Sequence, residues 1–335
     1  MKICIVGAGA IGGMLAARLA HAGHDVTVIV RGANLEAVRR QGGMKLIWED
    51  GTELLGPLRA TDDPREAGPQ DLVILTLKAH QLHPLLDRLP ALLRDDTPIV
   101  TMQNGIPFWY FHRHGGEFEG RPVESVDPGG VLLKALEGQR IIGAIVYPAA
   151  ELTGPGVIRH IEGNRFSLGE PDGSKTPRLE SIAHTLIQAG FKAPVTTDIR
   201  SEIWLKLWGN AVFNPVSALT HATLEDICRF PLTRDLAAKV MAEAQAIGER
   251  LGVRFKVSID KRIAGAEAVG AHKTSMLQDV EAGRPLELEA LVGSVVELGR
   301  LTGIPTPHID AVYACASLLA KTLGDASGKL AVVAR

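Results

Sequence analysis

The segment from residue 200 to residue 215 holds a pattern that could carry out acid catalysis. Lys206, Asn210 and Asn214 are four residues apart, which places them on one stripe of a helix. The other positions are largely apolar, so we expect a mostly buried helix whose polar stripe faces a cleft. A lysine ammonium can protonate an oxygen that becomes negative, and amides can hold neighbouring oxygens. The stripe therefore predicts a site for a substrate carbonyl, with a solvent-facing stripe as the alternative.

A second chemical pattern stands near the start of the chain, directly after the apolar run Ile3–Val6. It has glycines in the spacing G-x-G-x-x-G and consists of Gly7, Ala8, Gly9, Ala10, Ile11 and Gly12. Such a run allows a tight turn, lets a pyrophosphate approach backbone N–H groups, and places it at a helix N-terminus. We therefore predict a dinucleotide-binding loop, with an ordinary glycine-rich turn as the alternative.

Arg31 follows the next apolar run, Val26–Val30. Dinucleotide folds that prefer NAD usually carry an acidic residue there, which bonds the ribose hydroxyls. An arginine can instead pair with a 2′-phosphate, so the sequence favours NADPH/NADP⁺ as the cofactor. A solvated surface arginine is the alternative.

Two further polar residues stand at the carboxyl ends of predicted strands. Lys78 follows Leu72–Leu77, and Asn104 comes shortly after Ile99–Met102. Ligands of open α/β sheets bind outside this edge of the strands, so both are candidates for cofactor or substrate contacts. Each could also be a simple turn residue, since Asn-Gly is a common turn dipeptide.

Ser275 and Glu287 are polar residues whose presence can be explained by the local structure expected around them. Ser275 stands where an N-cap of a following helix is expected, and Glu287 stands in a predicted first turn beside Pro285. Their residue types and positions alone therefore do not make them site residues.

The first part of the chain alternates short apolar runs with helical patterns, which is typical of a parallel sheet with crossover helices. Strands are predicted at Ile3–Val6, Val26–Val30, Leu72–Leu77, Ile99–Met102, Ile141–Tyr147, Val157–Ile161, Arg165–Leu168 and Lys192–Thr196. Helices are predicted at Ala10–Ala22, Gln81–Leu93 and Arg178–Ala189.

The remainder of the chain has helical periodicity almost throughout. Helices are predicted at Ile199–Leu219, Thr233–Leu251, Ile259–Val269, Leu286–Thr302 and His308–Leu323. Gly252, Gly303 and Gly324 follow three of these segments, as glycines that end helices do. The predicted fold is an α/β Rossmann-type dinucleotide-binding domain over residues 1–197, followed by an all-α C-terminal domain over residues 198–335.

The composition of the chain argues against nucleic acids and membranes as partners. The chain of 335 residues has 36 Lys and Arg against 38 Asp and Glu, a net charge of −2, which argues against a nucleic-acid binder. Its unbroken apolar stretches are far shorter than the roughly 20 residues that cross a bilayer, so no membrane segment is expected.

Cysteine and histidine usage point to neither disulfides nor a metal. Cys4, Cys228 and Cys315 are odd in number and far apart, so we expect a protein of the reducing cytoplasm without a disulfide framework. Two histidine pairs have spacings that a metal site could use, but both lack nearby cysteines or clustered carboxylates. The pairs are His80 with His83 and His112 with His114.

Taken together, the chain resembles the ketopantoate reductase (2-dehydropantoate 2-reductase) family over about residues 1–310. The matching pieces occur in family order. They are Gly7–Gly12, Leu75-Thr76-Leu77-Lys78-Ala79, Asn104-Gly105, the Glu202–Asn214 helix with Lys206, Ser275-Met276-Leu277-Gln278-Asp279, and Glu287.

The resemblance implies NADPH-dependent reduction of the 2-keto group of ketopantoate to (R)-pantoate, on the route to pantothenate and coenzyme A. It also implies an active site in the cleft between the two domains. By this resemblance Lys206 is the general acid and Glu287, a second catalytic residue, meets a substrate hydroxyl. The implied substrate or nicotinamide contacts are Asn210, Asn214, Ser275 at the carboxylate, Lys78 and Asn104.

Two positions depart from the family pattern. Leu224 stands where an asparagine is expected ten residues beyond Asn214, and His272 stands where the family often has asparagine. A site that loses such a hydrogen-bond partner can discriminate strongly against the oxygen left unpaired. A reductase of another, less hydroxylated branched 2-oxo acid is therefore the alternative function, and a non-catalytic NADP(H)-binding sensor is a third.

The chain is also longer than is usual in this family between Asn104 and Ile141. This stretch contains the aromatic run Phe108-Trp109-Tyr110-Phe111. The run could be a core cluster, or it could form a lid or a subunit contact, the latter in a homodimer.

Overall fold

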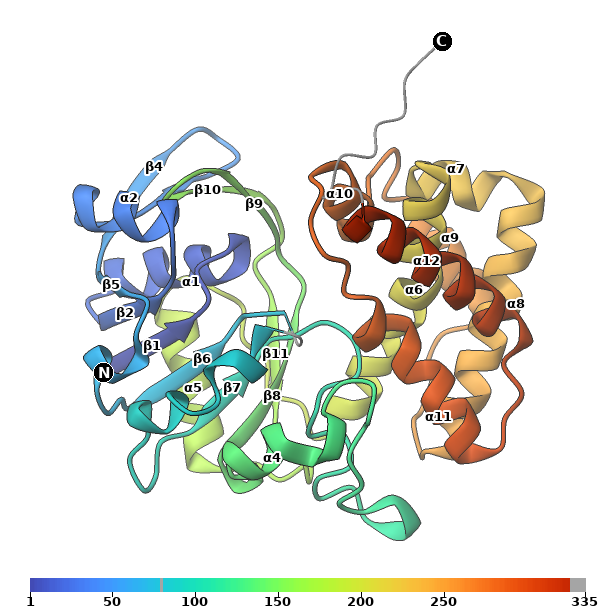
Figure 1. Cartoon of the computed structure of the whole chain (residues 1–335), viewed down its shortest axis with the longest axis horizontal. Helices are drawn as coiled ribbons and strands as arrows, with labels where there is room; N and C mark the ends of the chain where they lie inside the picture. The colour runs from blue at the N-terminus through green and yellow to red at the C-terminus, as the bar shows by residue number, and fades with distance from the viewer. Residues whose placement is uncertain (79–80, 326–335) are drawn as a thin grey trace. The chain divides into compact units, whose positions relative to one another are not determined.

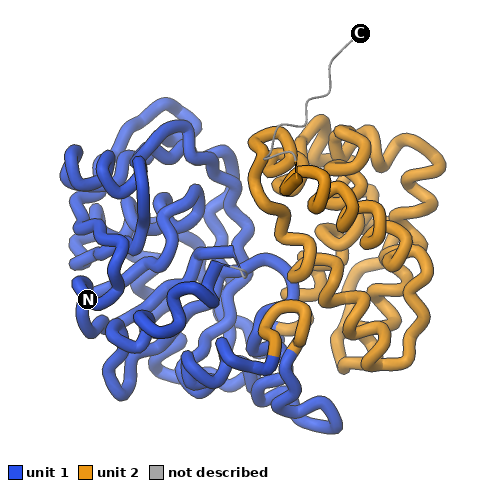
Figure 2. The backbone as a smooth tube through the Cα atoms, in the orientation of Figure 1, with its two compact units in different colours: residues 1–122, 129–199 blue, residues 123–128, 200–335 orange. Residues whose placement is uncertain are grey.

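The computed structural model describes residues 1–78 and 81–325, which divide into two compact units (Figure 2). The first unit comprises residues 1–122 and 129–199, and the second comprises residues 123–128 and the chain from Arg200 onward. The boundary expected near residue 197 lies beside the passage from Ile199 to Arg200. No sequence pattern indicated that the short segment 123–128 belongs with the helical unit.

A seven-stranded sheet runs through the first unit in the order β11-β8-β7-β6-β1-β2-β5 (Figure 1). Its strands are parallel except β11, which is antiparallel to β8. Their bounds are β1 Lys2–Val6, β2 Asp25–Ile29, β5 Arg59–Thr61, β6 Leu72–Leu75, β7 Ile99–Thr101, β8 Ile141–Val146 and β11 Phe166–Gly169. The predicted Rossmann-type domain is confirmed.

The inner strands β6 and β8 are apolar along their whole length, as is typical of parallel sheets covered on both faces. Every residue of β6 and of β8 is buried. On one face, α1 and α5 share a core with the sheet, which includes Leu15, Val28 and Leu186. The helices of this unit are α1 Ala10–His21, α2 Ala33–Gln41, α3 Pro64–Ala67, α4 Val131–Ala135 and α5 Pro177–Gln188.

A second, four-stranded sheet in the order β4-β3-β10-β9 packs on α1 through Met44 and Ile158. The strands are β3 Gly43–Ile47, β4 Glu53–Pro57, β9 Ala149–Gly154 and β10 Val157–Glu162. Only β10 was predicted. The outer strands β4 and β9 are largely exposed, so their sequences lack the apolar runs that mark the buried strands.

The helix predicted at Gln81–Leu93 is wrong. The chain forms only short 3₁₀ turns there, at His83–Leu85 and Leu89–Leu92. Pro84 and Pro90 stand at the start of these turns, and a proline inside a helix removes a backbone donor and clashes with the preceding turn. The helical spacing of the leucines is therefore overridden by the two prolines.

Between Arg200 and Asp325, where the structure describes it, the second unit is all-α, as predicted (Figure 1). Its helices are α6 Ile199–Thr220, α7 Leu224–Arg229, α8 Pro231–Arg250, α9 Ile259–Glu267, α10 Ser275–Glu281, α11 Ser294–Thr302 and α12 Pro307–Asp325. Helix α7 was not predicted. A capping box of Thr223 and Asp226 starts it, and this local signal compensates for its short length.

Two predicted helix ends need correction. The segment expected to be helical from Leu286 begins at Leu288 and passes through a π-helical turn, Glu289–Gly293, before α11. Gly303 ends α11 in the left-handed conformation, as predicted, but Gly324 lies inside α12.

The aromatic run 108–111 is a core cluster. All four side chains are at most 2% exposed, and Tyr110 and Phe111 pack edge to face. The indole N–H of Trp109 donates a hydrogen bond to Thr101 Oγ1 at 2.7 Å. Side chains buried in this way do not form a mobile lid.

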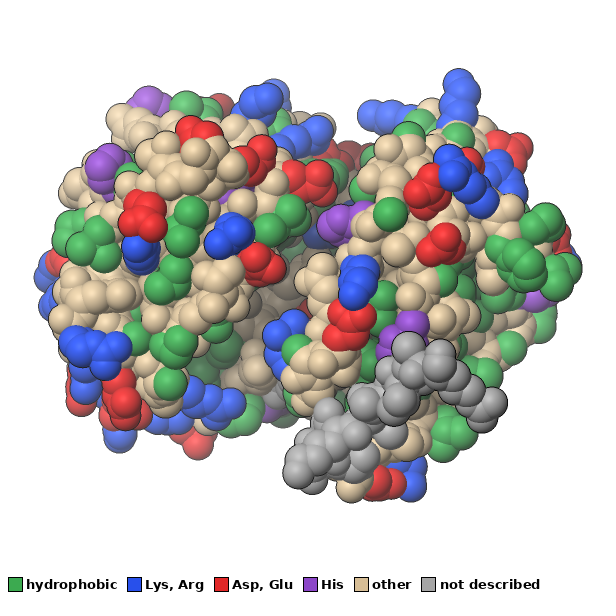
Figure 3. All heavy atoms as spheres, turned by 90° about the horizontal axis from the view of Figure 1, so that it is seen from above, with side chains coloured by type: hydrophobic (Ala, Val, Ile, Leu, Met, Phe, Trp, Pro, Cys, Tyr) green, Lys and Arg blue, Asp and Glu red, His purple; other side chains and the backbone are tan. Residues whose placement is uncertain are grey.

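Charged side chains of both signs are interspersed over the face of the molecule shown in Figure 3. Within residues 1–78 and 81–325, no helix is both long and apolar enough to span a membrane. In the same ranges, no three His, Cys, Asp or Glu side chains are grouped as metal ligands would be. His80, a member of one histidine pair, lies outside the described residues, as does Ala79.

Candidate active site

The glycine loop between β1 and α1 has the geometry that the sequence predicts. Gly7 has φ +103°, a conformation that side chains with a Cβ rarely adopt. A Cβ on Gly12 would lie 1.9 Å from Gly7 O and 2.4 Å from Thr76 Oγ1, so only glycine allows this close packing. Thr76 Oγ1 donates to Gly7 O at 2.5 Å and holds the turn to the end of β6. No role for Thr76 was predicted, although it follows a buried strand at the cofactor edge.

Gly9 differs from the other two glycines because a Cβ there would meet nothing within 4 Å. It is exposed and serves as the N-cap of α1, directly before Ala10 and Ile11. The open space, the free approach to the backbone and the helix N-terminus together suit the pyrophosphate of a dinucleotide. Ala8 is buried below the turn, and Arg31 is exposed just after β2.

Lys78 and Asn104 follow the neighbouring parallel strands β6 and β7. Strand β6 ends at Leu75, earlier than predicted, and Lys78 then lies in a loop, where its backbone N–H donates to Gln81 Oε1 at 3.1 Å. The side-chain amide of Gln103 donates to the carbonyl oxygens of Leu75 and Leu77 at 3.2 and 3.3 Å. Gln103 therefore joins the two loops. Sequence reasoning assigned it no role.

The predicted polar stripe lies on α6 in the second unit. Trp204, Leu207 and Trp208 are at most 1% exposed, so the apolar side of this helix is deeply buried, as predicted. Lys206 and Asn210 are partly buried, and Asn214 is 5% exposed. The stripe is thus not a solvent-facing surface of the helix. Pro215 follows it without interrupting α6.

Asn214 and Ser275 meet although they are 61 residues apart in the sequence: Asn214 Nδ2 donates to Ser275 Oγ at 3.4 Å. The N-cap of α10 is Thr274, whose side chain accepts from Leu277 N, so the local explanation of Ser275 as the N-cap is wrong. Ser275 is exposed on the first turn of α10. Its hydroxyl is therefore available to the site rather than used in capping.

Lys206 and Glu287 form the electrostatic centre of this group. Burial lowers the pKa of the Lys206 ammonium to about 8, and the Glu287 carboxylate opposes that shift by favouring the charged form. Glu287 is partly buried in the irregular segment before Leu288, so it is not a first-turn helix residue. A π-helical turn begins two residues later, at Glu289, and such turns are frequent near functional sites.

The two positions that depart from the family pattern are neighbours in the structure. Leu224 N, at the start of α7, donates to His272 O at 3.0 Å. Both lie near elements of the candidate site, since Ser275 is three residues beyond His272.

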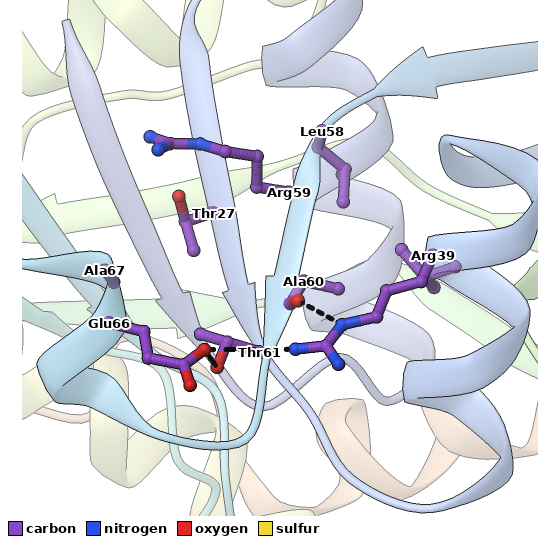
Figure 4. A pocket seen from close by; sticks show the side chains of 9 residues that line it. Thr27, Arg39, Leu58, Arg59, Ala60, Thr61, Glu66 and Ala67 are labelled. Carbon is purple, nitrogen blue, oxygen red and sulfur yellow. Dashed lines mark hydrogen bonds and ion pairs between the residues drawn. The ribbon is translucent and has the colours of Figure 1, made fainter.

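A cavity of about 340 Å³ lies at the edge strand β5 and is lined by residues of β2, α2, β5 and α3 (Figure 4). Its polar groups bond one another: Arg39 Nε donates to Ala60 O at 2.9 Å, and Thr61 Oγ1 donates to Glu66 at 2.5 Å. None of the predicted site residues lines it. Some of the predicted residues belong to the first unit and the others to the second.

Comparisons with known proteins agree with these features. The family description "Ketopantoate reductase PanE/ApbA" matches residues 3–117, and "Ketopantoate reductase PanE/ApbA C terminal" matches residues 198–320. A Mesorhizobium japonicum protein named 2-dehydropantoate 2-reductase is 56% identical over 325 residues, which cover 97% of this chain and 99% of that protein.

Solved structures have the same fold. One from Ralstonia solanacearum, described as a candidate ketopantoate reductase, has a TM-score of 0.92 at 43% identity and covers 96% of this chain and 98% of its own. A D-mandelate dehydrogenase bound to NADH and anilino(oxo)acetate has a TM-score of 0.82 at 22% identity, with 97% and 99% covered, a likeness of fold alone. With both family regions matched in order and a close relative along nearly its whole length, the chain belongs to the ketopantoate reductase family.

Proposed function

We propose that this protein reduces 2-dehydropantoate to (R)-pantoate with NADPH, and that Lys206 supplies the proton. The chain is an NADP-dependent oxidoreductase by family, and pantothenate biosynthesis is the process to which this reaction belongs. The residue assignment rests on two interactions within the second unit. Glu287 influences the pKa of Lys206, and Asn214 is hydrogen-bonded to Ser275.

The first unit would hold the cofactor. The backbone of Gly7–Gly12 and the N-terminus of α1 fit the pyrophosphate, and Arg31 would pair with the 2′-phosphate. Lys78 and Asn104, in the loops that follow β6 and β7, would lie near the nicotinamide and the substrate. When bound, NADPH supplies the hydride that the C2 carbonyl carbon accepts.

Lys206 would protonate the carbonyl oxygen as negative charge develops on it. A general acid works best when its pKa lies near the working pH, and burial brings the Lys206 pKa to about 8 from 10.5. Glu287 keeps the ammonium charged until the proton is needed. Without this carboxylate, burial would leave a larger share of Lys206 neutral.

The remaining polar groups would hold the substrate. Asn210 and Asn214 offer amide donors along the same helix stripe as Lys206, which suits the oxygens next to the carbonyl. Ser275 would donate to the substrate carboxylate, and Glu287 would accept from its hydroxyl. Each of these contacts uses an atom type that the substrate carries.

Substitution of Lys206 tests the proposal. Lys206→Ala should lower kcat by roughly 10²–10⁴-fold, while NADPH affinity stays near normal, because the lost group acts only on the carbonyl oxygen. Steady-state turnover and a fluorescence titration with NADPH measure the two effects. Lys239→Ala, an exposed lysine paired with Asp235 on α8, is the matched control. Normal turnover of the Lys206 variant would remove its catalytic role.

A panel of 2-oxo acids tests the substrate. We expect kcat/KM to be highest for 2-dehydropantoate and lower for a branched 2-oxo acid of similar size without the hydroxyl. The opposite order would favour the alternative substrate class that Leu224 and His272 suggest. Binding of NADPH without oxidation on any member of the panel would instead indicate a sensor.

We further propose a homodimer in the cytoplasm as the working form. Three free thiols, of Cys4, Cys228 and Cys315, are compatible with a reducing compartment. Light scattering of the purified protein measures the mass of the assembly, and a mass of about 35.8 kDa would contradict the dimer.

A further inference from the structure

We propose that Trp109 is a positioning residue that holds the loop of Asn104 in place. This inference rests on the proposed role of Asn104 at the substrate. The loop, residues 102–107, leaves β7 after Thr101 and ends at the aromatic run. Trp109 Nε1 donates a hydrogen bond to Thr101 Oγ1 at 2.7 Å. This bond joins two residues eight positions apart, one on each side of the loop.

The site of Trp109 is shaped for an indole. Trp109 is 1% exposed and Thr101 2%, so the bond between them is shielded from water. A Cβ on Gly143 of β8 would lie 2.6 Å from the six-membered part of the indole ring, so the absence of a side chain there makes room for tryptophan. The indole N–H is a donor only, and a buried donor needs an acceptor, which Thr101 provides.

The other end of the loop is held as firmly. Met102 N donates to Leu75 O at 2.9 Å, and the Gln103 amide bonds Leu75 O and Leu77 O. Gly105 has φ +86°, which lets the chain turn immediately after Asn104. Asn104 is therefore preceded by a residue tied to β6 and followed by a turn that Trp109 closes.

This arrangement pre-organises a proposed substrate contact. A side chain on a loop is only as well placed as its backbone, and a displacement of about 1 Å at a reacting group can lower the rate by roughly 10²-fold. The aromatic run thus has a use beyond filling the core. Trp109 touches no proposed substrate atom itself and would act through Asn104.

Substitutions at both ends of the bond, made with and without Asn104, test this inference. Trp109→Phe removes the indole donor. Thr101→Val keeps the side-chain shape but removes the acceptor and also the longer bond that the hydroxyl donates to Ile142 O at 3.4 Å. Each should lower kcat/KM for 2-dehydropantoate roughly tenfold, with NADPH affinity within about twofold of normal. In the Asn104→Ala background, the same changes should alter kcat/KM by less than about twofold, because the group they position is gone.

Thr185→Val is the control, since Thr185 is a buried threonine whose hydroxyl donates to Ser181 O at 2.9 Å within α5. It should leave kcat/KM unchanged. Thr101→Val carries the test if the phenylalanine variant does not fold. Equal losses in both backgrounds, or no loss when Asn104 is present, would overturn the positioning role. Normal kcat/KM of Asn104→Ala alone would overturn the assignment of Asn104, and with it the role of Trp109.

Discussion

The ammonium of Lys206 is subject to two opposing influences. Burial destabilises its charged form and lowers the pKa to about 8, whereas the Glu287 carboxylate stabilises the charged form. A general acid must release its proton readily and still carry it at the start of the reaction. The balance between these two influences therefore bears directly on the rate of the proposed proton transfer.

The pH dependence of kcat/KM should report this balance. Lys206 acts as an acid only when protonated, so activity should be present below about pH 8 and decline as the pH rises through that value. Glu287→Gln removes the influence that raises the pKa, so the alkaline decline should move to lower pH. A rate profile from pH 5 to pH 10 measures both, with the exposed Glu249→Gln as the control. An unmoved decline would show that Glu287 does not govern the titrating group.

Cofactor preference should depend on Arg31. Arg31→Asp replaces a positive charge by a negative one that repels a 2′-phosphate and can bond ribose hydroxyls. We expect kcat/KM for NADPH to fall roughly 10- to 100-fold relative to that for NADH, since close charge pairs contribute about 1.5–3 kcal/mol. Initial rates with each cofactor measure the ratio, and Arg40→Asp on α2 is an exposed control. An unchanged ratio would place the 2′-phosphate elsewhere.

For single residues, spacing in the sequence predicted which side chains share one face of a helix. It did not predict which side chains from different helices come into contact. Lys206, Asn210 and Asn214 share a stripe because of helix geometry alone. Ser275 joins Asn214 only through the packing of α10 against α6, which no local pattern encodes. Ser275 and Glu287 therefore entered the prediction through family resemblance.

At the scale of elements, the three glycines of the loop between β1 and α1 have different structural roles. Gly7 and Gly12 are required by backbone conformation and close packing, so they maintain the turn itself. Gly9 satisfies neither requirement and leaves open space. The sequence motif does not distinguish the three glycines. In the structure, Gly7 and Gly12 support the loop, whereas Gly9 leaves room for a ligand.

Alanine substitutions should separate these two uses. Gly12→Ala forces a Cβ into Gly7 O and Thr76 Oγ1, so the free energy of unfolding should fall by about 2–4 kcal/mol. Gly9→Ala should leave stability within about 1 kcal/mol yet weaken NADPH binding roughly 10-fold or more, because the methyl group occupies the approach to the pyrophosphate. Urea unfolding and NADPH titration measure the pair. Similar behaviour of both variants would contradict this division.

The elements that sequence patterns predicted well are those with continuous buried apolar runs. Strand β6 is apolar throughout, β1 is apolar after Lys2, and both were found. The exposed strands β4 and β9 have mixed patterns and were missed, because they are strands chiefly by pairing with β3 and β10. The wrong helix at Gln81–Leu93 shows the reverse error, in which apolar spacing was given more weight than two prolines.

At the level of the whole molecule, the chain does not divide at one point. It enters the second unit for residues 123–128, returns, and enters again at Arg200. The sequence pattern changes only near Arg200, where helical periodicity begins, so only this boundary between the units could be predicted. The segment 123–128 has no such local sign, and its backbone is hydrogen-bonded to Glu297, 173 and 172 positions later in the sequence.

Glu297 of α11 holds this early segment in the helical unit. Its two carboxylate oxygens accept from Glu124 N and Ser125 N, each at 2.8 Å. Hydrogen bonds to a charged acceptor contribute about 1.5–3 kcal/mol, so Glu297→Ala should lower the free energy of unfolding by about that amount, and Glu297→Gln by less. Urea unfolding of the full chain measures this loss.

Amide exchange locates the effect of the same substitution. Without the carboxylate, the N–H groups of Glu124 and Ser125 lose their acceptors, so their exchange should quicken at least tenfold, which corresponds to about 1.4 kcal/mol of lost local protection. Glu281→Ala, which removes an exposed partner of Lys273 on α10, should leave these two amides unchanged. If their exchange rates in Glu297→Ala matched those of the unsubstituted chain, residues 123–128 would be held by something other than this carboxylate. The unfolding free energy would then be expected to stay unchanged as well.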